Sequence, residues 1–246
     1  MRENTKLLYR QLVKELERKG NRKRAQKDRY YHKYAGYKSY GIQAPQLHTI
    51  LRGHKKEFVS LIDREVFELT QLLYQSRIED LVLASNYLLT LHRNSITPQK
   101  FRWLDKMLDY FGSWSTIDDF CVDVLPSVLL KYPKETIVLL RRWNKSKNMW
   151  KRRASVVAFV RKIGESGKFT DTVLQLCSNL IWDSEDLVQK GVGWTLKDNM
   201  RGHKKKVMQY VNGLRRKRVN STIILYAIRD LRGREREEVL SIPPVG

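Results

Sequence analysis

The chain has 246 residues, of which 48 are Lys or Arg and 26 are Asp or Glu, so its formal net charge at pH 7 is +22. Small domains usually carry a net charge of roughly 2 to 8, because a larger excess repels itself within the fold. An excess of this size indicates a polyanionic partner, since each phosphate that is neutralised releases counterions and adds affinity.

Several classes of protein are excluded by simple patterns. Residues 1–20 lack the apolar run of a signal peptide, and no apolar run is long enough to span a membrane. Cys121 and Cys177 lie in apolar helical patterns, which is typical of small buried residues rather than of a disulfide. The five histidines are scattered and no Walker-type glycine loop occurs. We therefore predict a cytoplasmic protein with no membrane partner, no metal site and no cofactor.

Apolar residues recur with helical spacing along most of the chain, and sustained apolar/polar alternation is rare. The first helix is expected to end at Gly20, and the basic segment 21–29 can continue as a helix. The apolar stripe of the first helix consists of Leu7, Leu8, Leu12, Val13 and Leu16. The predicted fold class is all-α, in a single domain over residues 1–246, with an N-terminal helical region at 1–30 and a C-terminal tail at 233–246.

Three helical segments can be aligned on a small residue, which is Ala84, Ala154 or Gly191. Their spacing is one or two periods of about 35 to 37 residues, which is typical of repeated helical pairs. The diagnostic patterns of tetratricopeptide and ankyrin repeats are missing, so HEAT-like pairs fit better, although chance periodicity stays an alternative. Stacked pairs of this kind predict a right-handed superhelical solenoid, for which we expect a basic concave face.

The pentapeptide Arg-Gly-His-Lys-Lys occurs twice, at residues 52–56 and 201–205. Each copy follows an apolar helical pattern, where glycine can cap a helix and cations suit the C-terminal dipole. Capping is the default interpretation. The alternative is that both copies hold phosphates.

The segment Gly112–Phe120 carries the first chemical signal. Ser113 is suited to cap a helix, on which Trp114 and Asp118 then share one face. Asp119 points about 100° away from Asp118, so the two are not predicted to be a catalytic carboxylate pair. By itself, a Trp and an Asp at this spacing is more often a core aromatic residue beside a surface acid.

Two further tryptophans change that balance. Trp150 opens a helix that presents Arg153 in its first turn, and its simplest role is that of a core anchor. Trp194 follows Gly191 and Gly193, and each glycine costs a helix about 1 kcal/mol relative to alanine. Glycines tolerated there indicate either close helix packing or close approach of a ligand, and the sequence does not choose between them.

At this point the chain resembles a known family. Trp114-Ser-Thr-Ile-Asp118, Trp150-Lys-Arg-Arg153-Ala and Gln189-Lys-Gly-Val-Gly-Trp194-Thr-Leu are similar, in order and spacing, to the signature segments of the AlkD-like DNA glycosylases. This is the DNA alkylation repair family built from HEAT-like repeats. The resemblance runs from about Tyr31 to Leu231 and includes the turn at residues 40–45.

One departure stands beside this resemblance. The family generally carries an arginine soon after the proline of that turn, whereas Gln46, Leu47 and His48 follow Pro45 here. Docking by the N-terminal helices can therefore differ.

The resemblance implies a monofunctional glycosylase that excises cationic N3- or N7-alkylated purines from duplex DNA and leaves an abasic site, without needing to flip the base. By position, Asp118 is the catalytic carboxylate, Trp114 and Trp194 flank the lesion, and Arg153 holds the DNA. The partner is double-stranded DNA with alkylated bases, and the chain is expected to act as a monomer. Further cations expected to contact DNA are Arg152, Lys190, Lys197, Arg52, Lys55, Lys56, His203, Lys204 and Lys205.

The chemistry of such a reaction suits these residue types. An alkylated purine is already a cationic leaving group, so what remains is to stabilise an oxocarbenium-like sugar and to orient a water, which one carboxylate can do. Two indole faces attract cationic character by roughly 0.5 to 2 kcal/mol each. Two alternatives stay open, namely a non-catalytic relative that binds distorted or branched DNA, and a helical adaptor for an acidic protein or RNA.

Overall fold

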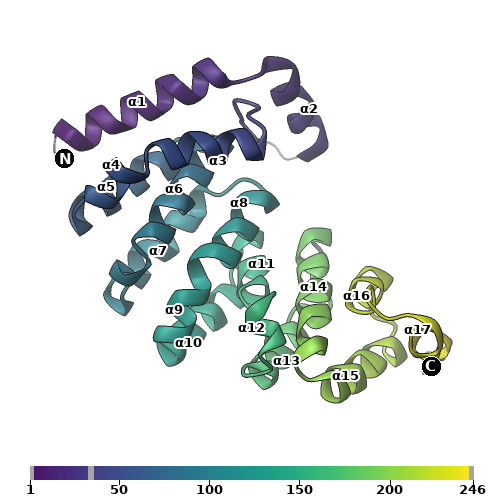
Figure 1. The fold of residues 1–246 in the computed structure, drawn as a ribbon. Coiled ribbons are helices and arrows are strands. Elements are labelled where there is room, and N and C mark those ends of the chain that lie inside the picture. Colours follow the sequence, from purple (N-terminus) through teal and green to yellow (C-terminus); the bar gives the residue numbers. More distant parts are fainter. Residues whose placement is uncertain (1–2, 33–35, 244–246) are drawn as a thin grey trace. The chain divides into compact units, whose positions relative to one another are not determined.

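The computed structural model of the protein describes residues 3–32 and 36–243 (Figure 1). Within these ranges the regular structure is helical, apart from one isolated bridge between Lys38 and Ile78. The all-α prediction is therefore confirmed. The chain forms two compact units, Met1–Pro133 and Lys134–Gly246, and each is described by itself. The single domain, the superhelical path and the basic concave face stay predictions.

Unit 1 consists of helices that pack both on their neighbours in the chain and on more distant helices. Helix α5 pairs with α6, α1 packs on α5, and α6 contacts α8 and the π-helical turn η4. Its elements are α1 (Glu3–Lys19), α2 (Arg22–His32), α3 (Ala44–Gly53), α4 (Lys55–Ser60), α5 (Asp63–Gln75), α6 (Glu79–Leu91), η1 (Arg93–Ser95), η2 (Pro98–Lys100), α7 (Phe101–Met107), η3 (Leu108–Tyr110), α8 (Trp114–Asp119), η4 (Phe120–Val124) and α9 (Leu125–Lys131).

The first helix ends where the sequence predicts, just before Gly20. A Cβ at Gly20 would lie 2.7 Å from the carbonyl oxygen of Tyr40, so glycine is needed for the later turn to approach. The residues that α1 buries are Thr5, Leu8, Leu12 and Leu16. Leu7 is 51% exposed, so its place in the predicted stripe was wrong, because the buried face is narrower than the apolar pattern.

The turn at residues 40–45 is fixed to the start of α6 by a buried carboxylate. Asp80 is 3% exposed and accepts hydrogen bonds from the Tyr40 amide at 2.7 Å, the Ser39 hydroxyl at 2.9 Å and the Ile42 amide at 3.3 Å. Burial raises the pKa of Asp80, and these hydrogen bonds oppose that rise. The turn ahead of α3 is therefore a rigid part of the unit.

Unit 2 is centred on its longest helix, α14, which packs on α11, α12, α13, α15 and α16. Its elements are α10 (Pro133–Asn144, whose first residue closes unit 1), α11 (Met149–Val157), α12 (Lys162–Glu165), α13 (Thr170–Ser178), α14 (Asp186–Gly202), α15 (Lys204–Arg216), α16 (Ser221–Ala227) and α17 (Gly233–Ser241). The segment 233–246 was predicted to be a tail, and this is corrected for its first part, which forms α17. Val239 of α17 is buried, and this contact holds the helix on the unit. Residues 244–246 lie outside the described ranges.

The small residues that align in the sequence are buried in three different helices. Ala84 in α6, Ala154 in α11 and Gly191 in α14 are all buried, as close helix approach requires. Three buried asparagines each donate to a backbone carbonyl of another segment. These residues are Asn86, Asn144 and Asn199, whose acceptors are Thr116, Leu176 and Phe159. Burial of the three small residues agrees with the repeat interpretation, which stays a prediction.

Candidate functional site

Helix α8 begins as the sequence predicts. Ser113, 1% exposed, has extended backbone angles, and its hydroxyl accepts a hydrogen bond from the Thr116 amide at 3.3 Å. The hydroxyl of Ser115 donates to Glu79 of α6 at 2.5 Å. These bonds fix the first turn of α8, and with it the direction in which Trp114 leaves the backbone.

The indole of Trp114 is backed by aromatic side chains of α2. Its ring lies 5.5 Å from that of His32, nearly parallel at 29°, and 6.4 Å from Tyr31 in an edge contact. His32 is in turn stacked on Tyr37 at 4.3 Å. This stack was not predicted from the sequence. The run Tyr30-Tyr31-His32 is a visible signal, but nothing in it shows which ring it meets.

Asp118 and Asp119 diverge as helical geometry predicts. Asp119 faces α6, where its carboxylate accepts a hydrogen bond from Asn86 at 2.8 Å. The same amide group donates to the Thr116 carbonyl at 3.0 Å, and the Tyr74 hydroxyl donates to Asn86 at 2.7 Å. Asp118 is half-buried, one turn after Trp114. A buried polar chain therefore holds the helix that carries Trp114 and Asp118.

Immediately after Asp119 the chain makes one π-helical turn, η4, before it continues as α9. Such turns hold one residue more than an α-helical turn and often occur at functional sites. Burial raises the pKa of Asp119 to about 7. The hydrogen bond from Asn86 opposes this rise, and the charges of Asp123 and Asp118 add to it.

We expect Asp119→Asn to reduce the pH dependence of stability. Because its folded pKa is above the ordinary 3.8, the folded chain holds a proton that the unfolded chain releases, and stability falls as pH rises from about 4 through 7. The asparagine variant lacks this titration, so its free energy of unfolding should gain on that of wild type between pH ~4 and ~7, by at most about 1.4 kcal/mol per pH unit. Urea unfolding of both chains across that range measures the difference. Parallel profiles would contradict the expectation.

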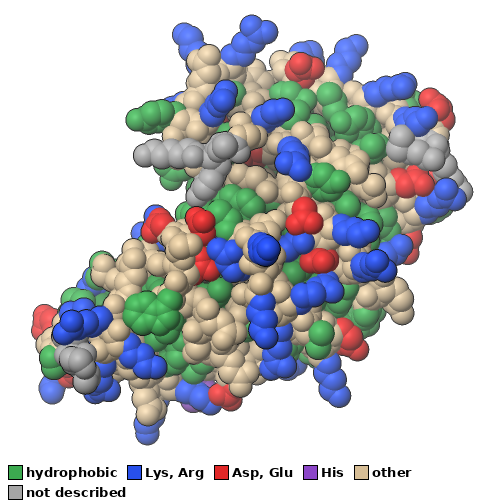
Figure 2. Space-filling model, turned by 180° about the vertical axis from the view of Figure 1, so that it is seen from behind, with side chains coloured by type: hydrophobic (Ala, Val, Ile, Leu, Met, Phe, Trp, Pro, Cys, Tyr) green, Lys and Arg blue, Asp and Glu red, His purple; other side chains and the backbone are tan. Residues whose placement is uncertain are grey.

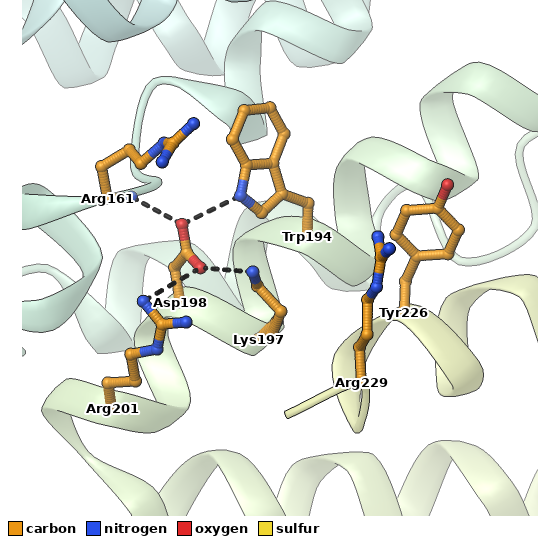
Figure 3. A pocket seen from close by; sticks show the side chains of 7 residues that line it. All are labelled: Arg161, Trp194, Lys197, Asp198, Arg201, Tyr226 and Arg229. Atoms are coloured by element: carbon orange, nitrogen blue, oxygen red, sulfur yellow. Dashed lines mark hydrogen bonds and ion pairs between the residues drawn. The ribbon is translucent and has the colours of Figure 1, made fainter. Parts of the chain in front are cut away.

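Trp194 is held by a second acid that the sequence analysis passed over. Its indole N–H donates to Asp198 at 2.9 Å, and the backbone N–H of Arg161 donates to the same oxygen at 2.7 Å (Figure 3). The other oxygen of Asp198 faces the ammonium of Lys197 at 3.2 Å. Trp194 and Asp198 repeat the four-residue spacing of Trp114 and Asp118, which is the signal that could have found them.

The two helix glycines beside Trp194 are explained by packing within unit 2. A Cβ at Gly193 would lie 2.4 Å from the Cβ of Tyr226 and 2.8 Å from the Ile223 carbonyl oxygen. A Cβ at Gly191 would lie 3.3 Å from the guanidinium of Arg153. Of the two open interpretations, close packing therefore accounts for both glycines.

Several of the cations predicted to contact DNA are engaged by the protein itself. Arg153 is 5% exposed and donates to the Leu187 carbonyl, which links α11 to α14. Arg152 forms a two-pronged ion pair with Asp183, at 2.6 and 3.0 Å. Lys190 pairs with Asp186 at 2.6 Å. Their contacts with DNA stay predictions.

The two Arg-Gly-His-Lys-Lys copies both lie at a junction of helices, where glycine is the last helical residue and histidine the cap. In the first copy, Arg52 and Lys55 are exposed and line a groove of about 570 Å³ with Pro45, His48, Thr49 and Tyr87, and Lys56 is exposed beside them. In the second copy, His203 and Lys205 are exposed, whereas Lys204 pairs with Glu235 at 2.5 Å. Both copies therefore end a helix as predicted, but the capping residue is histidine and not glycine. The phosphate-binding interpretation stays a prediction.

Among the described residues there is no group of three or more His, Cys, Asp or Glu side chains that could hold a metal ion. No described helix is long and apolar enough to cross a membrane. Cys121 and Cys177 are both buried, as their apolar surroundings predict.

Comparison with known proteins gives one matching family model and a similar solved structure. A family model described as "DNA alkylation repair enzyme" matches residues 12–231. A solved structure of a predicted DNA alkylation repair enzyme from Enterococcus faecalis is similar, with a TM-score of 0.76 and 15% sequence identity over 87% of this chain and 97% of that chain. At this identity the likeness shows the fold alone. The search of curated proteins finds no match. Since the family model covers most of the chain, including all three signature segments, this protein belongs to the DNA alkylation repair enzyme family.

Proposed function

We propose that this chain is a monofunctional DNA glycosylase that hydrolyses the N-glycosidic bond of cationic N3- and N7-alkylated purines in duplex DNA. It leaves an abasic site and does not need to flip the base. The observation that carries this proposal is the construction of α8. Trp114 and Asp118 lie one turn apart on a helix whose start is capped by Ser113 and whose far side is bonded to buried Asn86.

Asp118 supplies the one group that this reaction requires. An alkylated purine carries a positive charge, so when the bond to the sugar breaks, the bonding electrons neutralise the departing base. The sugar is left with oxocarbenium character, which a carboxylate stabilises electrostatically. Water then attacks the sugar carbon, and its proton passes to the carboxylate or to solvent. No general acid and no covalent intermediate is needed.

The two indoles flank the lesion in this proposal. Each can attract the positive charge shared by the purine and the sugar, by roughly 0.5 to 2 kcal/mol. Their orientations are preset, because Trp114 is backed by the His32 ring and Trp194 is bonded to Asp198. A preset ring loses less conformational entropy on binding than a mobile one.

The basic surface serves to bind the DNA backbone. Lys and Arg side chains project from many points of the face shown in Figure 2, where acidic side chains are fewer. Five of the proposed backbone contacts are exposed and form no ion pair with an acid among the described residues. They are Arg52, Lys55, Lys56, His203 and Lys205. Contacts of this kind position a duplex without reading its sequence, so a single chain suffices and we propose a monomer.

The second candidate function is a non-catalytic relative that binds distorted or branched DNA. The net charge of +22 favours it as much as it favours the enzyme, because charge supports binding whether or not chemistry follows. The two functions differ only in whether a base is released.

Incubation of the wild-type chain with methylated duplex DNA tests the proposal. We expect release of N3-methyladenine and N7-methylguanine well above spontaneous depurination, measured by chromatography of the freed bases. The same duplex without protein and an unmethylated duplex with protein are the controls. Release no faster than the spontaneous rate, together with tighter binding to branched than to linear DNA, would favour the non-catalytic function.

A further inference from the structure

Unit 2 contains a pocket of about 310 Å³ between α14, α16 and the turn that follows α11 (Figure 3). Four cations, one acid and two aromatic rings form its walls. They are Arg161, Lys197, Arg201 and Arg229, then Asp198, and Trp194 with Tyr226. The cavity is far larger than the roughly 10–15 Å³ that one water needs, and its lining carries an excess of positive charge.

The acid is turned into the wall and already bonded. Asp198 is 1% exposed, and one of its oxygens accepts from both the Trp194 indole and the Arg161 backbone. Its other oxygen faces Lys197 at 3.2 Å and Arg201 at 4.0 Å. Arg201 also pairs with Glu165 at 2.8 Å and with Asp230. The charges of Lys197 and Arg201 are therefore largely balanced within the protein.

The other two arginines are different. Arg161 and Arg229 are exposed, and within residues 3–32 and 36–243 neither guanidinium has an acidic partner within 4.0 Å. Each lies over an aromatic ring instead, Arg161 at 5.6 Å from the centre of Trp194 and Arg229 at 5.9 Å from that of Tyr226. A guanidinium placed over a ring keeps its N–H edges available, and those edges fit two oxygens of a phosphate at once.

The backbone at Arg161 adds an independent observation. Its φ is 55° and its ψ is −137°, a region that glycine enters readily and that costs other residues of the order of 1–3 kcal/mol. The Asp198 carboxylate holds this conformation through the Arg161 N–H. An arginine at this position therefore makes the fold less stable than a glycine would. Backbone strain of this kind is typical of binding sites.

We propose that this pocket is a phosphate subsite, in which Arg161 and Arg229 together grip one phosphodiester of the DNA backbone. The identification of DNA rests on the proposed function. The grip itself follows from two unpaired guanidinium groups placed on rings at the mouth of one basic cavity. Trp194 lies in the same wall, so the phosphate that is gripped belongs to the strand that passes Trp194.

The chain offers a matched pair of variants to test the grip. Arg218 is exposed, lies in the same unit, has a φ of 58° and does not line the pocket. Arg161→Gly and Arg218→Gly each remove one positive charge and relieve one positive φ, while the backbone N–H at 161 stays in place. Both variants should therefore melt at or above the wild-type temperature, which separates binding from folding.

Affinity for an undamaged duplex should distinguish them. We expect Arg161→Gly to weaken binding at least about fivefold and to lower the slope of log affinity against log salt by about 1, whereas Arg218→Gly changes affinity less than about twofold. Arg229→Gln should behave like Arg161→Gly. Because both arginines are assigned to one phosphate, the double variant should lower the slope by about 1 and not by about 2.

Three outcomes would overturn the proposal that the pocket grips a phosphodiester of DNA. The first is an equal loss of affinity in Arg161→Gly and Arg218→Gly, which would mean that only net charge matters. The second is a double variant whose slope falls by about 2, as for two separate phosphates. The third is that the pocket binds free phosphate rather than DNA. Inorganic phosphate would then raise the melting temperature of wild type but not of Arg161→Gly, while both chains would bind the duplex with the same affinity. A chain that binds duplex in the expected way but releases no methylated base would overturn the proposed function alone.

Discussion

Asp118→Asn should lower the rate of alkylpurine release by at least about a hundredfold while leaving the fold intact. The amide has nearly the size of the carboxylate but no charge, so it can no longer stabilise positive charge on the sugar. Because Asp118 is half-buried and the Asn86 chain that holds α8 runs through Asp119 and Thr116 instead, the helix should keep its position. Single-turnover release from methylated duplex, with the variant in excess over DNA, measures the chemical step.

The adjacent acid provides the matched control. Asp119→Asn makes the same chemical change one position along α8, on a side chain that faces α6, and its amide oxygen can still accept from Asn86. We expect it to keep its release rate within a few-fold of wild type near neutral pH. If Asp118→Asn and Asp119→Asn released bases equally fast, the catalytic carboxylate would have to be sought elsewhere.

Gly193→Ala should lower the free energy of unfolding by about 2 kcal/mol or more, although alanine is the better helix former. The new methyl group would lie 2.4 Å from the Cβ of Tyr226 and 2.8 Å from a backbone oxygen of α16, and neither is the movable end of a side chain. The steric cost of separating α14 from α16 outweighs the gain of about 1 kcal/mol in helix propensity. Urea unfolding measures the difference.

Gly213→Ala is the counterpart in the same unit. Gly213 lies in α15, and a Cβ there would meet nothing within 4 Å, so alanine should stabilise the chain by about 0.5–1 kcal/mol. The opposite signs at two helical glycines would show that packing, not propensity, decides at position 193. If both alanines stabilised the chain alike, α16 would have to be free to move away from α14.

The helices and their ends could largely be predicted from the sequence, because they depend on neighbouring residues. Ser113 caps α8, Gly20 ends the region of α1, and both Arg-Gly-His-Lys-Lys copies end a helix, all through local hydrogen bonding and backbone preference. The burial of Ala84, Ala154 and Gly191 could be predicted as well, since small residues at a regular spacing indicate close helix packing.

The partners of the side chains that carry chemistry could not be predicted in this way. His32 is distant in sequence from Trp114, and no periodic pattern records that their rings stack. Arg153 was assigned to DNA from the family resemblance, and nothing in the sequence shows that its side chain is buried and donates to the Leu187 carbonyl. Asp198 was missed because an acid that follows a lysine on a helix is normally exposed. Only the fold places the backbone N–H of Arg161 within hydrogen-bond distance of its carboxylate. Such contacts depend on which helix faces which.

The π-helical turn η4 affects the direction in which the side chain of Asp118 points. An α-helical turn holds 3.6 residues, so an inserted or deleted residue rotates everything on one side of it by about 100° relative to the other. The wide turn at Phe120–Val124 already contains such an extra residue, directly after the helix that bears Trp114 and Asp118. Loss of a single residue there would turn these two side chains together, with no substitution in either. The number of residues in this one turn therefore determines the direction in which Trp114 and Asp118 point relative to α9.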